Sequence, residues 1–263
     1  AMSTHRRFDR TARLLGDVAG VNVYGAGGMS SLPTLHGLAD DRLRIKVDGM
    51  DLISACGNHM NPALSYIDPT QVGSIQVFTG ITPVSAGGDA IGGSILVGSQ
   101  APEFAAPGQD LLTKGSLGAF YRSNGNGRGA NASATVATQN FSLRYNAASA
   151  ESGNYEAAQA FKSAIKAPAG VLIPGPKEVG SSEFRSRNQG LDLAVRGGDH
   201  LLELKLGRQD IPYQGFPNQR MDMTRNDSTH LNLRYQRSFD WGEPQARTWH
   251  EQTRHDMEIG RDQ

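Results

Sequence analysis

Cys56 is the one cysteine of this chain, and its thiol is the first group whose chemistry needs an explanation. A single thiol forms no disulfide within the chain, so it is either a small buried hydrophobic group or a metal ligand. Met60 lies four residues further on, just before Asn61-Pro62, so one loop or helical turn can offer both sulfurs to one ion. His255 and Met257 are two residues apart, so their side chains share a face if they lie on a strand. Thiolate, thioether and imidazole are soft or borderline donors that favour Cu(I) over zinc, iron or a hard cation.

Each of these residues also has an ordinary structural interpretation. A buried cysteine or methionine often only fills a core, and a histidine near a rim is commonly just solvated. His59 and the pair Met221 and Met223 are candidate secondary metal ligands, but a hydrogen bond for His59 and packing of an outer loop for the methionines are the favoured interpretations. No serine, histidine and aspartate follow a nucleophile motif, so the sequence predicts neither a catalytic site nor an enzyme.

The composition favours strands and turns over a helical bundle. The 263 residues include 32 glycines, and 26 basic side chains balance 26 acidic ones, so the overall charge does not indicate nucleic acid as a partner. No stretch approaches the roughly 18 apolar residues of a membrane-spanning helix. If the chain meets a membrane, it must therefore do so as a barrel.

The first hundred residues alternate helical and extended signals. Residues 11–18 suit one or two helical turns, and 21–24 suit a strand. Residues 43–47 alternate apolar and charged side chains before Asp48-Gly49, a strong hairpin signal. Asp68-Pro69 is a candidate helix start ahead of a second strand at 74–78. We therefore expect a small mixed α and β unit here.

After Pro102 the helical periodicity ends, and seven alternating segments follow. The predicted strands are 111–122, 130–138, 141–150, 184–196, 201–209, 229–239 and 246–259. Their lengths bracket the roughly 9–11 residues of a tilted strand that crosses a bilayer. Connections at 139–140, 197–200 and 240–244 are short, whereas 151–183 and 210–228 are long, as outer-membrane barrels require for their periplasmic and outer ends.

These segments have one apolar face and one charged face. Leu202, Leu204 and Leu206 alternate with Glu203 and Lys205. The same alternation recurs in two other segments, where Leu231, Leu233 and Tyr235 oppose His230, Asn232 and Arg234, and Phe141, Leu143 and Tyr145 oppose Ser142, Arg144 and Asn146. Lipid outside and water inside would produce this pattern. An antiparallel sheet or sandwich with one face on a core is the alternative, since it has the same period.

The segment 10–102 resembles the plug domain of TonB-dependent receptors, which fills the lumen of a large outer-membrane barrel. The resemblance rests on the stretches TARLLGDVAGV at 11–21, IKVDGM at 45–50, IDP at 67–69, VGSIQV at 72–77 and AIGGSI at 90–95. The family's usual Gly-Pro-Ala-Ser-x-x-Tyr-Gly block is replaced by GITPVSAGG at 80–88, which points to a subgroup.

Within that family the sequence is most similar to the copper receptors of the OprC and NosA group. Their Cys-x-x-x-Met spacing is present at Cys56 and Met60, and their His-x-Met spacing at His255 and Met257. This resemblance implies a single site that joins the four side chains where the plug meets the barrel wall. Strand direction, inferred from connection lengths, puts both halves at the outer entrance.

We therefore expect an α+β plug domain at 1–106, followed at 107–263 by the first part of an antiparallel transmembrane β-barrel. Plugged barrels use about 22 strands, so seven predict an incomplete chain. The expected function is capture and import of copper ion across the bacterial outer membrane, with the TonB energy-coupling complex and membrane lipid as partners and no organic cofactor. The alternatives are a receptor of the same fold for a siderophore, haem or vitamin, and a surface-binding protein that does not transport.

Overall fold

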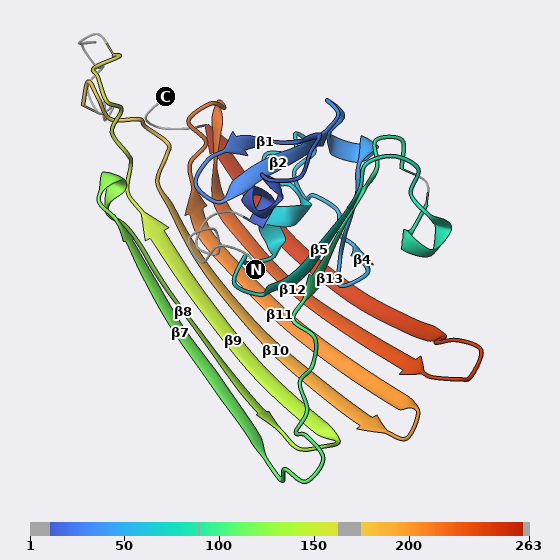
Figure 1. Cartoon of the computed structure of the whole chain (residues 1–263). Coiled ribbons are helices and arrows are strands. Elements are labelled where there is room, and N and C mark those ends of the chain that lie inside the picture. The colour runs from blue at the N-terminus through green and yellow to red at the C-terminus, as the bar shows by residue number, and fades with distance from the viewer. Residues whose placement is uncertain (1–10, 89, 163–174, 260–263) are drawn as a thin grey trace.

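The computed structural model describes residues 11–88, 90–162 and 175–259. These residues form two small sheets in the first hundred residues and one large sheet after them (Figure 1). The N-terminal unit contains η2 (Thr11–Leu15), β1 (Val21–Ala26), β2 (Ser30–Leu35), η3 (Asp40–Arg42), β3 (Arg44–Val47), β4 (Met50–Asp51), η4 (Ala63–Tyr66), β5 (Val72–Phe78), η5 (Val84–Ala86) and β6 (Ser94–Ser99). The large sheet contains β7 (Leu112–Arg122), η6 (Asn124–Asn126), β8 (Gly127–Ala137), β9 (Phe141–Ser152), β10 (Phe184–Gly197), β11 (His200–Gln214), β12 (Met221–Arg237) and β13 (Gln245–Ile259).

The N-terminal unit is a four-stranded sheet beside a separate hairpin. Its strand order is β4-β3-β6-β5, with β3 and β6 parallel, while β1 and β2 pair antiparallel. The predicted hairpin at Asp48-Gly49 is confirmed, since Val47 pairs with Met50 and the two turn residues have φ of 50° and 75°. Leu15, Leu35 and Ile95 are completely buried in the core that these elements share.

Two expectations for this unit are wrong. Asp68-Pro69 starts no helix: the Gln71 amide bonds to the Asp68 carbonyl, and the Asp68 carboxylate bonds to the Thr70 amide, which closes a local turn instead. The helical segments described by the structure are all 3-10 segments of three to five residues, so the α part of the predicted α+β class is not found in the described residues. Short segments that bury one turn against strands gain too little from helix propagation to extend.

The large sheet is an antiparallel meander in the order β13-β12-β11-β10-β9-β8-β7. All seven predicted strands are confirmed, most to within three residues. The predicted long connection at 210–228 is wrong, because β11 continues to Gln214 and β12 begins at Met221. Pro212 in β11 and a register shift between Met223 and Arg225 in β12 interrupt the alternation that marks a strand. β7 and β13 are the two edges of the described sheet, which is curved and open.

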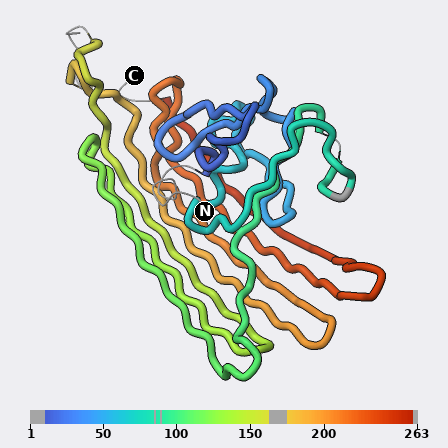
Figure 2. Tube along the Cα trace, in the orientation of Figure 1, coloured from blue at the N-terminus to red at the C-terminus, as the bar shows by residue number. Residues whose placement is uncertain are grey.

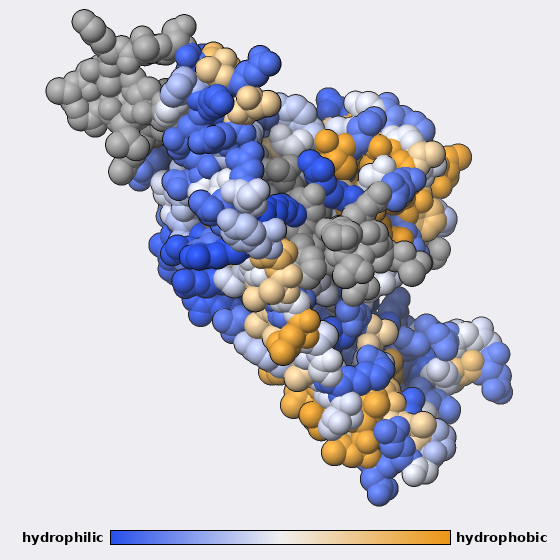
Figure 3. Space-filling view, turned by 60° about the vertical axis from the view of Figure 1, so that its left-hand side comes forward, coloured by the Kyte–Doolittle hydropathy of each residue, from blue (hydrophilic) through white to orange (hydrophobic). Residues whose placement is uncertain are grey.

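The polar face of the large sheet faces the N-terminal unit, which lies against its concave side toward the end with the longer connections (Figure 2). Glu203 and Asn232 are buried on that face, whereas Leu202, Leu206 and Leu231 of the same strands are exposed on the other. On the side of the large sheet that Figure 3 shows, hydrophilic residues gather toward the end with the longer connections and hydrophobic ones toward the short turns. The predicted division into a lipid-type face and a polar face is therefore present. No helix among the described residues is long and apolar enough to cross a membrane.

Leu204 lies at the centre of the outward apolar row of β11, between Leu202 and Leu206. A substitution there tests whether this face of the sheet contacts lipid. Leu204→Arg is expected to destabilise the protein in lipid vesicles by about 2–4 kcal/mol, because a guanidinium at bilayer depth loses its hydration. Thr229→Arg is the matched control, since Thr229 is exposed, faces outward opposite Arg208 and lies beyond the apolar row. Urea unfolding of the vesicle-bound protein measures both, and equal losses would contradict the lipid-facing assignment.

Candidate metal centre

Cys56 and Met60 lie on the loop between β4 and η4. The Cys56 carbonyl accepts a hydrogen bond from the His59 amide at 2.9 Å, which closes a turn, and His59 takes a positive φ of 51°. The Ser54 hydroxyl lies 3.0 Å from the Cys56 carbonyl oxygen and 2.9 Å from that of Asn61, so it holds the two ends of the loop together. Both sulfur side chains are buried by this arrangement.

Five sulfur-containing side chains meet where this loop contacts the large sheet. We call this group the sulfur cluster: Cys56, Met60 and Met223 are buried, and Met221 and Met257 are partly buried and pack against them, with Ala26, Ile211 and Phe216 completing the surroundings. Cys56 and Met60 come from the N-terminal loop, and the other three sulfurs come from β12 and β13. Segments about 160 to 200 residues apart in the sequence therefore contribute to one apolar cluster of soft donors.

His255 lies on β13 on the same side as Met257, as the two-residue spacing predicted. Met257 pairs with Met223 and His255 pairs with Asn226 across β12. The Nδ1 atom of His255 lies 3.1 Å from Oδ1 of Asn226. The other ring nitrogen, Nε2, is buried and has no hydrogen-bond partner. A buried polar atom left unpaired costs free energy, so this nitrogen is available to bind a cation.

The structure therefore brings Cys56, Met60 and Met257 into one cluster and puts His255 next to it on the same face. The His59 ring lies beside Asp41 instead, with its Nε2 3.9 Å from the carboxylate. Met221 and Met223 lie on β12 and not in an outer loop, and Met223 is completely buried. No group of three or more histidine, cysteine, aspartate or glutamate side chains comes together in the described part of the chain.

A row of buried polar side chains leads away from His255, and the sequence did not point to it. Asn226, on β12, is followed by Gln209 on β11 and Asn188 on β10, and the row ends at Asp68 of the N-terminal unit. All four side chains are at least nine-tenths buried. Burial raises the pKa of the Asp68 carboxyl, against the lowering effect of its hydrogen bonds from Thr70 and Asn188. Inward alternation places amides on this face, but their alignment across strands follows only from the register.

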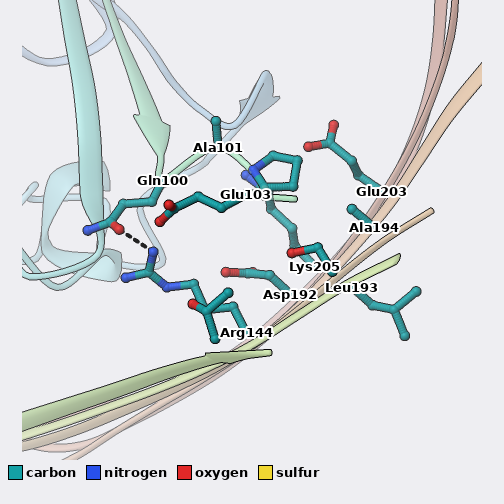
Figure 4. Close-up of a pocket in the computed structure, with 12 residues that line it drawn as sticks. Gln100, Ala101, Glu103, Arg144, Asp192, Leu193, Ala194, Glu203 and Lys205 are labelled. Carbon is teal, nitrogen blue, oxygen red and sulfur yellow. Dashed lines mark hydrogen bonds between the residues drawn. The ribbon is translucent and has the colours of Figure 1, made fainter. Parts of the chain in front are cut away.

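A second polar contact lies deeper along the concave face and contains none of the predicted ligands. Lys205 of β11 forms an ion pair with Asp48 at 2.9 Å, and the backbone amide of Ser99 donates to the same Asp48 oxygen at 2.9 Å. Beside it is a small pocket under residues 100–103, where the Arg144 guanidinium donates to Gln100 and Asp192 lies next to Lys205 (Figure 4). Ionic and polar bonds, not apolar packing, hold the two parts together here.

Comparison with known proteins decides what the N-terminal unit is. Residues 3–94 match the family model described as the TonB-dependent Receptor Plug Domain. The chain carries a TonB-dependent receptor plug. No curated protein matches the chain. The plug is thus the N-terminal unit. It packs on the polar face of the large sheet through its loop at 54–61 and its turn at Asp48-Gly49.

Solved structures of TonB-dependent receptors share the fold of both the plug and the large sheet. The copper transporter OprC superposes with a TM-score of 0.77 at 24% identity, over 94% of this chain and 36% of that one. The FrpB iron transporter from Neisseria meningitidis, F3-3 variant, gives 0.68 at 21% identity, over 90% and 37%. The siderophore receptor PirA from Pseudomonas aeruginosa gives 0.60 at 15%, over 96% and 39%.

This chain therefore spans little more than a third of the length of these receptors. TonB-dependent receptors are β-barrel proteins of the outer membrane, and they are transporters, not enzymes. The large sheet corresponds to part of such a barrel wall, and we call it the barrel sheet from here on. Because the solved relatives carry copper in one case and iron or siderophores in others, the fold alone assigns no cargo.

Proposed function

We propose that this protein captures copper at the outer face of the outer membrane and imports it past its plug, with the TonB complex supplying the energy. The plug would comprise residues 1–106, and residues 107–263 would form the first part of the barrel. Cys56, Met60, His255 and Met257 would hold the ion at the contact between the two. Copper, as Cu(I), is the cargo and not a resident cofactor.

The observation that carries this proposal is the donor set. Two thioethers and a thiol share a buried cluster with the next inward residue of β13, a histidine whose Nε2 is buried and unpaired. Soft sulfur donors bind Cu(I) in preference to Mg²⁺, Ca²⁺ or Fe³⁺, and two thioethers disfavour zinc. Met221 and Met223 are adjacent thioethers from which an arriving ion would exchange into the site.

The position of the sulfur cluster along the barrel sheet also supports capture at the outer entrance. Met257 lies near the end of β13 at the same end of the barrel sheet as the connections at 123–126, 153–183 and 215–220, while the opposite end has those at 138–140, 198–199 and 238–244, so the longest connection, 153–183, is on the side of Met257. In outer-membrane barrels the longer connections are extracellular. An ion that arrives from outside would therefore meet the cluster before it meets the body of the plug.

The rival cargo within the family is a ferric siderophore, since PirA is a siderophore receptor. Such a ligand encloses Fe³⁺ in its own hard oxygen donors and gains nothing from a thiol and two thioethers. Uptake of radioactive copper and of ferric siderophores by cells with and without the protein separates the two. We expect copper accumulation that requires both the protein and an intact TonB complex. Accumulation of a siderophore with no change in copper would overturn the proposal, and binding without accumulation would indicate a surface-binding protein.

A further inference from the structure

The buried row from His255 to Asp68 is a single chain of hydrogen bonds that all point the same way. Asn188 Nδ2 donates to Asp68 Oδ2 at 3.2 Å, Gln209 Nε2 donates to Asn188 Oδ1 at 2.9 Å, and Asn226 Nδ2 donates to Gln209 Oε1 at 3.4 Å. Asn226 Oδ1 then lies 3.1 Å from Nδ1 of His255. Each link crosses from one barrel strand to the next, and the last reaches the plug.

The direction of this chain is fixed by two acceptors that belong to the plug. The backbone carbonyl oxygen of Ser65 has no proton to give, and it lies 2.9 Å from Gln209 Nε2, so the amide of Gln209 must face it with its NH₂ group. The same Nε2 of Gln209 donates to Asn188 Oδ1, so the NH₂ group of Asn188 faces Asp68, whose Oδ2 accepts from it. With Gln209 oriented, its Oε1 takes the NH₂ of Asn226, which leaves the carbonyl of Asn226 turned to His255.

A carbonyl facing Nδ1 decides which ring nitrogen of His255 carries the proton. Nδ1 must be the N–H donor, so the neutral ring keeps its lone pair on Nε2, the atom that is buried without a partner. A metal ion binds only a nitrogen with a free lone pair, and the hydrogen bond at the opposite nitrogen selects it.

We propose that Asn226, Gln209 and Asn188, oriented by Ser65 and Asp68 of the plug, act as positioning residues that hold His255 in the Nδ1–H tautomer with Nε2 ready for a soft cation. The inference rests on the proposed function for the identity of that cation. It adds that the barrel-wall half of the site is prepared for the ion by the seated plug. Displacing the plug removes the two acceptors, which frees the amides to turn and weakens the hold on the ion.

The tautomer can be read in the metal-free protein by ¹⁵N NMR of the histidine rings, with His255→Gln used to assign the signal. We expect a protonated Nδ1 and an unprotonated Nε2 in the wild type at neutral to mildly alkaline pH. Asn226→Leu, which removes the acceptor, and Gln209→Leu, which lets Asn226 turn over, should each give a mixture of tautomers. Asn226→Asp should retain the wild-type tautomer, since a carboxylate oxygen accepts the same proton.

Asn232→Leu is the matched control. Asn232 lies on the same strand and face, is 4% exposed and bonds to the Asp48 carbonyl of the plug, but it has no link to His255. Heat-modifiable migration in gels verifies that each variant is folded. Cu(I) affinity, by competition with a chromophoric chelator, should fall about 10- to 100-fold in Asn226→Leu and Gln209→Leu and stay near wild type in Asn226→Asp and Asn232→Leu.

A wild-type ring protonated on Nε2, or a ring unaffected by Asn226→Leu and Gln209→Leu, would overturn the inference. An equal change in the Asn232→Leu control would do the same, because it would mark a general loss of structure. If the wild type binds no copper but its ring has the expected tautomer and responds to the variants, the copper proposal fails while the positioning role stands.

Discussion

Cys56→Ser is expected to abolish high-affinity Cu(I) binding while leaving the protein folded. The substitution replaces only the sulfur atom by oxygen in a side chain that is 9% exposed, so the packing of the loop is almost unchanged. An alcohol oxygen is a poor donor for Cu(I), whereas a thiolate is among the strongest. The loss should therefore exceed the roughly 10- to 100-fold caused by removing a group that only orients a ligand. Chelator competition and the copper content of purified protein measure it.

The chain offers two matched controls for that experiment. His59→Gln lies in the same turn as Cys56, but its ring faces Asp41, so copper affinity should stay near the wild-type value. Met29→Leu removes a thioether that lies outside the sulfur cluster, with its sulfur 3.7 Å from the Ser186 hydroxyl. Met257→Leu, in contrast, should weaken binding, since that sulfur is inside the cluster. Wild-type affinity in Cys56→Ser would mean that the cluster is a hydrophobic core and nothing more.

Much of the fold was predictable because side-chain alternation marks its strands and turn residues mark their ends. Alternation of Leu202, Glu203, Leu204 and Lys205 predicted a strand and both of its faces, and the buried Glu203 beside the exposed Leu202 agrees. Asp48-Gly49 predicted its turn, because positive φ is tolerated at aspartate and glycine. The prediction missed the end of β11 and the start of β12, because Pro212 and the register shift after Met223 interrupt the alternation there.

The candidate site was likewise predicted only in part. The four predicted ligands were found through the resemblance to the copper receptors, whose Cys-x-x-x-Met and His-x-Met spacings they match, and three of them share the cluster. The amide row was not found, because Asn226, Gln209 and Asn188 have unremarkable spacing in the sequence. Only the pairing of Asn188 with Gln209 and of Asn226 with His255 puts them in line, and register is a property of paired strands, not of one strand. Residues that act through others are therefore the part of such a site that sequence patterns miss.

Two of the links between plug and barrel sheet, the Asp68 row and the Asp48 contact, are polar, whereas the sulfur cluster is an apolar link. Apolar burial resists separation in proportion to area, whereas a few oriented hydrogen bonds and one ion pair are lost together when their geometry changes. The Asp68 row reaches the candidate site, and the Asp48 contact lies on neighbouring positions of the same strands, where Lys205 and Gln209 both belong to β11. A modest displacement would therefore break the two polar links, while the apolar sulfur cluster would resist separation of the plug.

Lys205→Met is expected to cost about 3–5 kcal/mol of stability, because it leaves the Asp48 carboxylate buried without its cation. Both side chains are largely buried, at 15% and 17% exposure, so solvent screens the pair only weakly. Denaturant unfolding gives the loss, and hydrogen exchange of the Asp48 and Ser99 amides, bonded to Val97 and to Asp48 in the wild type, localises it. Lys114→Met is the control: its pair with Glu103 is exposed, and about 0–1 kcal/mol is expected.

The dependence of this loss on pH distinguishes an ion pair from simple packing. Burial raises the pKa of Asp48, but Lys205 and the bonds from Ser99 outweigh it and hold that pKa below its ordinary value of 3.8. The stabilisation is therefore complete above that value and disappears as the pH falls through the folded-state pKa. Without Lys205, burial acts with less opposition and the carboxyl takes up a proton at higher pH. The difference between wild type and Lys205→Met should thus be largest near neutrality and shrink on acidification, whereas a loss of alkyl packing would be constant across the same range.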